Sequence, residues 1–90
     1  MLKSKQQVVW RSKGDLLVVL DTVSGHYYTL NQVAAMLWRG LFEKNQSLPG
    51  VVEEMVVTYP SGPTPAQIDL DCREAIAFWT QEGLVEEISS

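Results

Sequence analysis

Few residues of this 90-residue chain could act as a nucleophile or a base, because it holds one cysteine, Cys72, and one histidine, His26. Nucleophilic catalysis needs a nucleophile, a base and a group that orients the base. Cys72 falls on an apolar helical stripe, where a buried and inert thiol is the common case. His26 opens a strand directly after a turn. We therefore predict that the chain is not an enzyme.

Metal and cofactor chemistry find equally little support in the sequence. One cysteine and one histidine can form neither a disulfide nor a tetrahedral zinc site with Cys and His ligands. The six glycines are scattered and form no phosphate-binding loop. Neighbouring helix residues face different directions, so the paired carboxylates do not converge locally. We expect no metal and no cofactor; the pairs are Glu53-Glu54, Asp69 with Asp71, and Glu86-Glu87.

The net charge of −4 is unevenly distributed along the chain. Residues 1–44 hold six of the seven basic residues, whereas residues 45–90 hold Arg73 alone against eight acidic residues. An acidic C-terminal half repels phosphate and attracts cationic partners, although simple solubility explains it equally well. Nucleic-acid binding relies on Lys and Arg, so the charge opposes the DNA-binding role that a winged-helix fold permits.

No apolar run approaches the ~20 residues that span a bilayer. The segment 1–7 is polar and basic, unlike the apolar region of a signal peptide. We expect no membrane association and a cytoplasmic location. The length fits a single domain over residues 1–90.

Alternating apolar residues and short turns predict three strands at residues 7–11, 16–20 and 26–30. The short connections favour an antiparallel meander. The first turn, 12–15, contains Gly14, which suits a positive φ angle.

Three helices follow, each with a recognisable start. Asn31 and Ser47 are suitable N-caps for the first and second helices, and Pro60 ends the second. Thr64-Pro65-Ala66-Gln67 has the form of a capping box, and Gly83 fits the left-handed position after the third helix. The order predicts an α+β fold of winged helix-turn-helix type, with a three-stranded antiparallel sheet followed by three helices.

In a meander the third strand, 26–30, lies at a sheet edge with unpaired N–H and C=O groups. Protected edges carry Pro, Lys or bulges, and this strand contains no Pro, Lys or Arg. It could therefore accept an extended peptide as an added strand. The alternatives are that the chain's own tail, 84–88, or a dimer partner covers this edge.

The segment Gly25–Trp38 reads G-H-Y-Y-T-L-N-Q-V-A-A-M-L-W. It resembles the G-x-x-Y-x-L-N-x-x-A-x-x-[IL]-W core of PqqD-like proteins, the RiPP recognition elements. The Trp79-x-x-x-Gly83-Leu84-Val85 ending fits as well, and the resemblance extends over nearly the whole chain.

The resemblance implies that the domain binds the leader segment of a ribosomally made precursor peptide. The leader would add as a strand beside strand 26–30, in a groove closed by helix 65–82. Carried onto this sequence, the site residues are Tyr27, Tyr28, Thr29 and Leu30 on the strand, and Asp69, Cys72, Arg73, Ile76 and Thr80 on the helix. Asp69 and its neighbours would suit basic residues of a leader.

The resemblance also indicates a pathway. A free-standing chain of this length is similar to the discrete recognition proteins of lasso-peptide biosynthesis, which act beside a separate leader peptidase and a cyclase. The alternatives are a PqqD-type peptide chaperone that works with a radical SAM enzyme and a winged-helix DNA-binding regulator.

Overall fold

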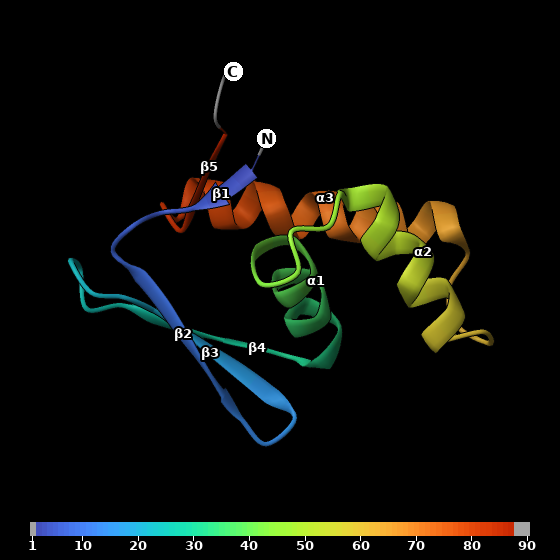
Figure 1. Cartoon of the computed structure of the whole chain (residues 1–90), viewed down its shortest axis with the longest axis horizontal. Coiled ribbons are helices and arrows are strands. Elements are labelled where there is room, and N and C mark those ends of the chain that lie inside the picture. Colours follow the sequence, from blue (N-terminus) through green and yellow to red (C-terminus); the bar gives the residue numbers. More distant parts are fainter. Residues whose placement is uncertain (1, 88–90) are drawn as a thin grey trace.

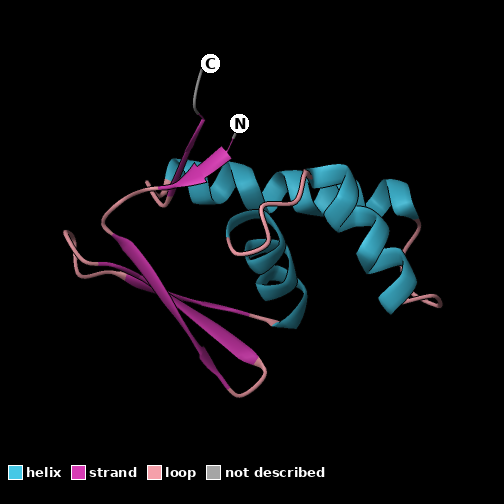
Figure 2. Cartoon of the chain, in the orientation of Figure 1, coloured by secondary structure: helices cyan, strands magenta, loops and turns pink. Residues whose placement is uncertain are grey.

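The computed structural model describes residues 2–87 of the chain. Three strands form a sheet on one side of the helices, and two short strands lie beside the end of a helix (Figure 2). The elements follow the order β1 (Leu2–Ser4), β2 (Val8–Lys13), β3 (Leu16–Asp21), β4 (Tyr27–Leu30), α1 (Gln32–Phe42), α2 (Leu48–Thr58), α3 (Pro65–Gln81) and β5 (Val85–Glu87). This order confirms the predicted α+β fold of three antiparallel strands followed by three helices.

The main sheet has the strand order β2-β3-β4, and all pairs are antiparallel. Gly14, with a φ of 62°, allows the tight turn between β2 and β3. The alternation of side chains places Leu17, Val19 and Leu30 in the core. The three predicted strands are therefore present, with ends that differ by one or two residues.

A second, two-stranded sheet was not predicted from the sequence. β1 pairs antiparallel with β5, with Leu2 opposite Glu87 and Ser4 opposite Val85. Figure 1 shows this pair beside the C-terminal end of α3. The tail expected at 84–88 therefore forms a strand that pairs with β1 rather than with β4, and Ile88 lies outside the described residues.

The helix ends follow the predicted capping chemistry. The side-chain oxygens of Asn31, Ser47 and Thr64 accept hydrogen bonds from the third residue after each. At the end of α3, Gly83 has a φ of 78°, and the Leu84 amide donates to the Trp79 carbonyl at 2.9 Å. This bond is that of a Schellman motif, and it turns the chain from α3 into β5.

α1 lies between the sheet and α3 (Figure 1). Buried Trp38 packs edge-on against Trp10 of β2, with ring centroids 5.4 Å apart, and against Trp79 of α3, at 5.0 Å. The Trp10 ring nitrogen also donates to the Glu43 carboxylate at 2.7 Å. These contacts fix the position of α3 relative to the sheet.

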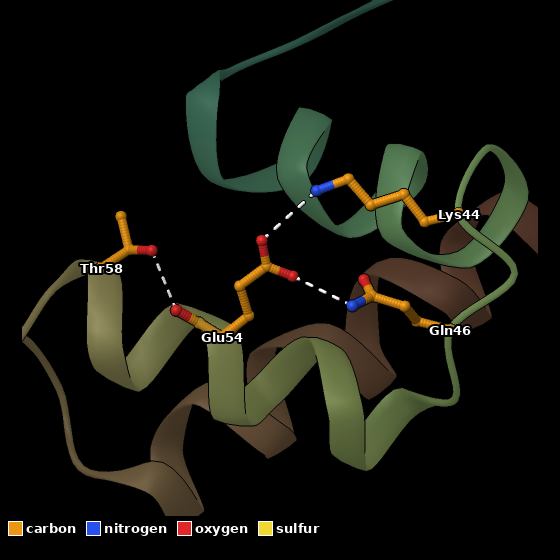
Figure 3. Close-up of polar contacts among 4 residues, drawn as sticks. All are labelled: Lys44, Gln46, Glu54 and Thr58. Carbon is orange, nitrogen blue, oxygen red and sulfur yellow. Dashed lines mark hydrogen bonds and ion pairs between the residues drawn. The ribbon is translucent and has the colours of Figure 1, made fainter.

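The loop after α1 positions α2. A Cβ atom at Gly40 would lie 2.7 Å from Val51, so only glycine permits this approach of the two helices. Figure 3 shows that the Glu54 carboxylate accepts hydrogen bonds from Gln46, at 3.1 Å, and from Lys44, at 3.3 Å. These two bonds, the one from Gln46 first, lower the pKa of Glu54.

The β3–β4 turn positions β4 through Asp21. One Asp21 carboxylate oxygen accepts hydrogen bonds from the amides of Val23, at 2.9 Å, and Ser24, at 3.2 Å. These two backbone hydrogen bonds lower the pKa of Asp21. Gly25, with a φ of 80°, completes the turn, and its amide donates to the Asp21 carbonyl.

No helix within residues 2–87 has the length and apolar character needed to cross a membrane.

We predict that Asp21→Asn lowers the melting temperature at neutral pH, because an amide oxygen is a weaker acceptor than a carboxylate. The Asp21 contribution is present above the ordinary Asp pKa of about 3.9 and is lost as the pH falls through the lower folded-state pKa. The difference between variant and parent should therefore shrink below about pH 4, as measured by thermal unfolding from pH 2 to 7. Asp15→Asn, at an exposed turn position, is the control. An equal loss in this control would reject the turn explanation.

Candidate functional site

The outer edge of β4 carries unpaired backbone groups. The Asp21 amide donates to the His26 carbonyl at 2.9 Å, which makes these two residues a hydrogen-bonded pair of the ladder. Hydrogen-bonded and non-hydrogen-bonded pairs alternate in an antiparallel ladder. Tyr28 and Leu30 therefore pair with β3, whereas the N–H and C=O groups of Tyr27 and Thr29 point away from it. Among residues 2–87, no strand pairs with this edge.

The opposite edge of the sheet differs from the β4 edge in charge. β2 carries Arg11 and Lys13, the kind of residue that protects an edge from pairing. β4 reads Tyr-Tyr-Thr-Leu and has no charge. The two edges are therefore not equivalent as templates for an added strand.

The inner side of β4 faces the C-terminal half of α3. The Tyr28 ring packs edge-on against Phe78, with centroids 6.3 Å apart, and its hydroxyl donates to the Glu82 carboxylate at 3.2 Å. Burial, and then the Glu82 charge, raise the pKa of Tyr28 and keep the hydroxyl protonated. Phe78 remains 51% exposed. Tyr28, Phe78 and Glu82 thus form a contact that joins β4 to the C-terminal end of α3.

A cavity of about 480 Å³ begins where β4 ends. Asn31, the residue after Leu30, belongs to its wall, and the remaining lining is mainly apolar. Two polar groups also lie there, the Asp71 carboxylate and Tyr59, whose buried hydroxyl has no hydrogen-bond partner among the described residues. Such a cavity suits an apolar side chain near a polar group. Its walls are Asn31, Val33, Ala34, Leu37, Met55, Tyr59, Gly62, Pro63, Ile68, Asp71, Cys72 and Ala75.

The strand residues expected in the site lie together on β4. Tyr27 and Thr29 are exposed on the outer face of β4, Tyr28 is half-buried, and Leu30 is buried in the core. Of the helix residues, Cys72 lines the cavity.

The other expected helix residues lie elsewhere on α3. Positions two residues apart on a helix differ by about 200° in direction. Asp69 and Arg73 are each two residues from Asp71, and Thr80 is two residues from both Phe78 and Glu82. Asp69, Arg73 and Thr80 therefore lie on the flank of α3 that is turned away from Asp71, Phe78 and Glu82. Asp69 and Arg73 form an ion pair of 2.7 Å on this flank. Ile76 is partly buried against the core. A role of Asp69, Arg73, Ile76 and Thr80 in binding stays a prediction.

Sequence reasoning missed Asp71, Phe78 and Glu82 as groove residues. They recur at helical spacing along the flank of α3 that faces β4 and the cavity. The available signal was Phe78, a large aromatic residue one position away from the apolar stripe that contains Trp79. An aromatic residue outside the main stripe indicates a second contact surface on the same helix.

Cys72 is 3% exposed, and its sulfur lies 3.9 Å from that of Met55. Burial, followed by the charges of Asp69 and Asp71, raises the pKa of the thiol. Its environment therefore disfavours the thiolate that a nucleophile requires.

Within residues 2–87, no three His, Cys, Asp or Glu residues are placed to hold a metal ion. The arrangement offers an open strand edge, an aromatic contact beside it and an apolar cavity, which suit an extended peptide.

Comparisons with known proteins identify one family and two similar structures. The family model of coenzyme PQQ synthesis protein D (PqqD) matches residues 17–85. The structure of TbiB1 in complex with the TbiA(beta) leader peptide is 22% identical, with a TM-score of 0.85 and coverage of 98% of this chain and 99% of that chain. Lasso peptide synthetase B1, complexed with the leader peptide, is 19% identical, with a TM-score of 0.87 and coverage of 96% and 98%. At these identities the likeness establishes the fold. Among curated proteins, none matches significantly.

We predict that Cys72 reacts slowly with a thiol-specific disulfide reagent at pH 8 in the folded protein, because it is buried and its pKa is raised. The absorbance of the released chromophore measures the rate. In denaturing urea the same thiol should react at the rate of an ordinary cysteine. Rapid reaction of the folded chain would contradict the inert environment described above.

Proposed function

The chain belongs to the PqqD family, and from that membership we propose that it binds the leader segment of a precursor peptide. The family model covers more than half of the chain and confirms the resemblance seen in Gly25–Trp38. Proteins of this family are non-catalytic, peptide-binding partners. In the proposed complex, in the cytoplasm, the leader adds as a strand to β4 in the groove closed by α3, and the domain delivers the precursor to a separate leader peptidase.

The open edge of β4 is the observation that carries this proposal. The backbone groups of Tyr27 and Thr29 point away from β3, and β5, which could have covered them, pairs with β1 instead. β-Strand addition draws its affinity from such backbone groups and its specificity from side-chain pockets. Two chains of the same fold were solved in complex with leader peptides, which supports the same use of the groove here.

Each wall of the groove has a separate part in the proposed binding. Tyr27 and Thr29 hydrogen-bond the main chain of the leader, and its inward side chains contact Tyr28 and Phe78. An apolar residue of the leader occupies the cavity that Cys72 lines. Asp71 and Glu82 attract basic leader residues, the role that the sequence also suggests for Asp69.

We predict that Thr29→Pro weakens leader binding by roughly three- to tenfold, because it removes one edge N–H that the peptide would use. The fold should survive, since proline is tolerated at an edge strand when its N–H faces away from the sheet. The leader of a precursor encoded beside this chain is titrated, and isothermal calorimetry gives the affinity.

Thr29→Val is the matched control, because it keeps the backbone N–H and the β-branched shape. Equal affinities of the two variants would refute strand addition at β4. When the leader titration is followed by NMR, the shifted backbone amides should be those of β4 and of Asp71, Ala75 and Phe78. Shifts on Asp69, Arg73 and Thr80 would instead support the other flank of α3.

We propose that the chain acts in lasso-peptide biosynthesis, beside a leader peptidase and a cyclase. The match to lasso peptide synthetase B1 over nearly both full chains favours this pathway. A PqqD-type chaperone that works with a radical SAM enzyme is the second candidate, because the matching family model is described as coenzyme PQQ synthesis protein D.

We predict that a lasso-precursor leader binds at least about tenfold more tightly than a peptide precursor of PQQ, as measured by competition in fluorescence anisotropy. Thr29→Pro should weaken both peptides by a similar factor and leave the preference unchanged if both use the β4 edge, because the lost hydrogen bond goes to the main chain. The reverse preference would assign the chain to the quinone-cofactor pathway and would leave leader binding itself intact.

A further inference from the structure

Glu82, at the C-terminal end of α3, has a neutral hydrogen-bond partner, whereas Asp69 of the same helix is ion-paired with Arg73 at 2.7 Å. Among residues 2–87, no Lys or Arg pairs with Glu82, and the Tyr28 hydroxyl donates to its carboxylate at 3.2 Å. This distance exceeds the roughly 2.5 to 3.0 Å that is usual for O–H···O bonds. A cationic donor bonds a carboxylate about twice as strongly as a neutral donor. A basic group of a ligand would therefore displace the hydroxyl.

The open edge of β4 determines which leader residue meets this contact. Tyr27 and Thr29 offer their backbone groups to an added strand, so Tyr28 lies between two hydrogen-bonded positions. In an antiparallel addition, the leader residue opposite Tyr28 forms a non-hydrogen-bonded pair with it, in which the two side chains share a face and lie closest together. The side chain of that leader residue therefore turns inward beside the Tyr28 ring, toward α3.

The surroundings of this inward position suit a long basic side chain. Phe78 is 51% exposed, and its ring centroid lies 6.3 Å from that of Tyr28, so the two rings offer an aromatic surface to a methylene stem. The Glu82 carboxylate lies at the hydroxyl end of the Tyr28 ring. The rings and the carboxylate both attract a cation. Lys and Arg combine the stem with the charge, whereas Asp and Glu would be repelled.

The next inward position of the leader meets different chemistry. Side chains alternate along a strand, so this position lies two residues away, opposite Leu30. The mainly apolar cavity begins beside it, at Asn31. The two neighbouring inward positions of the leader thus favour a basic and an apolar side chain respectively.

We propose that Glu82 is a specificity-determining residue, which selects a Lys or Arg at the leader position opposite Tyr28. In the free chain the Tyr28 hydroxyl occupies the Glu82 carboxylate, and on binding the cation of the leader takes its place. The apolar leader residue that enters the cavity lies two positions from this Lys or Arg. The proposal rests on the proposed function and adds to it the side chain that one leader position requires.

The test uses the full chain and the leader of the precursor encoded beside it, with each Lys and Arg of the leader replaced by Gln in turn. Glu82→Gln should weaken binding of the unaltered leader at least about fivefold, because it removes the charge and keeps the shape. One leader variant should lose a similar factor, and it should bind Glu82→Gln and the unaltered chain equally. Fluorescence anisotropy measures the affinities. Glu74→Gln, at an exposed position of α3, is the matched control and should bind as the unaltered chain does.

Tyr28→Phe tests the exchange itself. This variant keeps the ring and loses the hydroxyl, so the leader no longer has to displace a hydrogen bond from Glu82. Its affinity for the unaltered leader should rise about twofold. Its affinity for the leader variant that lacks the selected basic residue should not rise. An unchanged or lower affinity for the unaltered leader would overturn the exchange.

The outcomes separate this proposal from leader binding. If no Lys or Arg of the leader couples to Glu82, or if Glu74→Gln weakens binding as much as Glu82→Gln, the selection of a basic residue is overturned. Leader binding at β4 would then still stand on the Thr29→Pro result. A leader that binds at β4 and contains no Lys or Arg also overturns the selection. A chain that binds no leader overturns both proposals.

Discussion

The contacts of Trp38 hold together the layers on which the groove depends. Its ring is fully buried and meets Trp10 from the sheet, Trp79 from α3 and Phe42 from its own helix, all at steep angles. Edge-to-face packing of this kind is favourable and fixes direction as well as distance. β4 and α3 contact each other through few side chains, so the spacing of the groove walls is determined largely by this cluster.

Local chemistry allowed much of the fold to be predicted from the sequence. Asn31, Ser47 and Thr64 each cap a helix through a side-chain oxygen, a short-range preference that requires no knowledge of the rest of the fold. The β1–β5 pair could not be predicted in this way. Its strands have three residues each and come from opposite ends of the chain, so neither alternation nor a turn signal identifies them.

The two walls of the candidate site differed in how well they could be predicted. A strand has only two faces, so simple alternation puts Tyr27 and Thr29 on one face of β4 and Tyr28 and Leu30 on the other. A helix can turn any of several flanks toward a neighbour. The flank of α3 that faces β4 is set by how α3 crosses α1, which is a property of the packed structure. Positions such as Phe78 and Glu82 became assignable only once that crossing was known.

The pairing of β1 with β5 gives the domain a geometry that suits its insertion into another protein. Because Leu2 lies opposite Glu87, the two ends of the described chain are roughly 5 Å apart. A host protein could carry the domain in a surface loop whose two ends lie close together, and neither the host nor the domain would be distorted. Since the open edge belongs to the other sheet, such an insertion would leave the groove accessible.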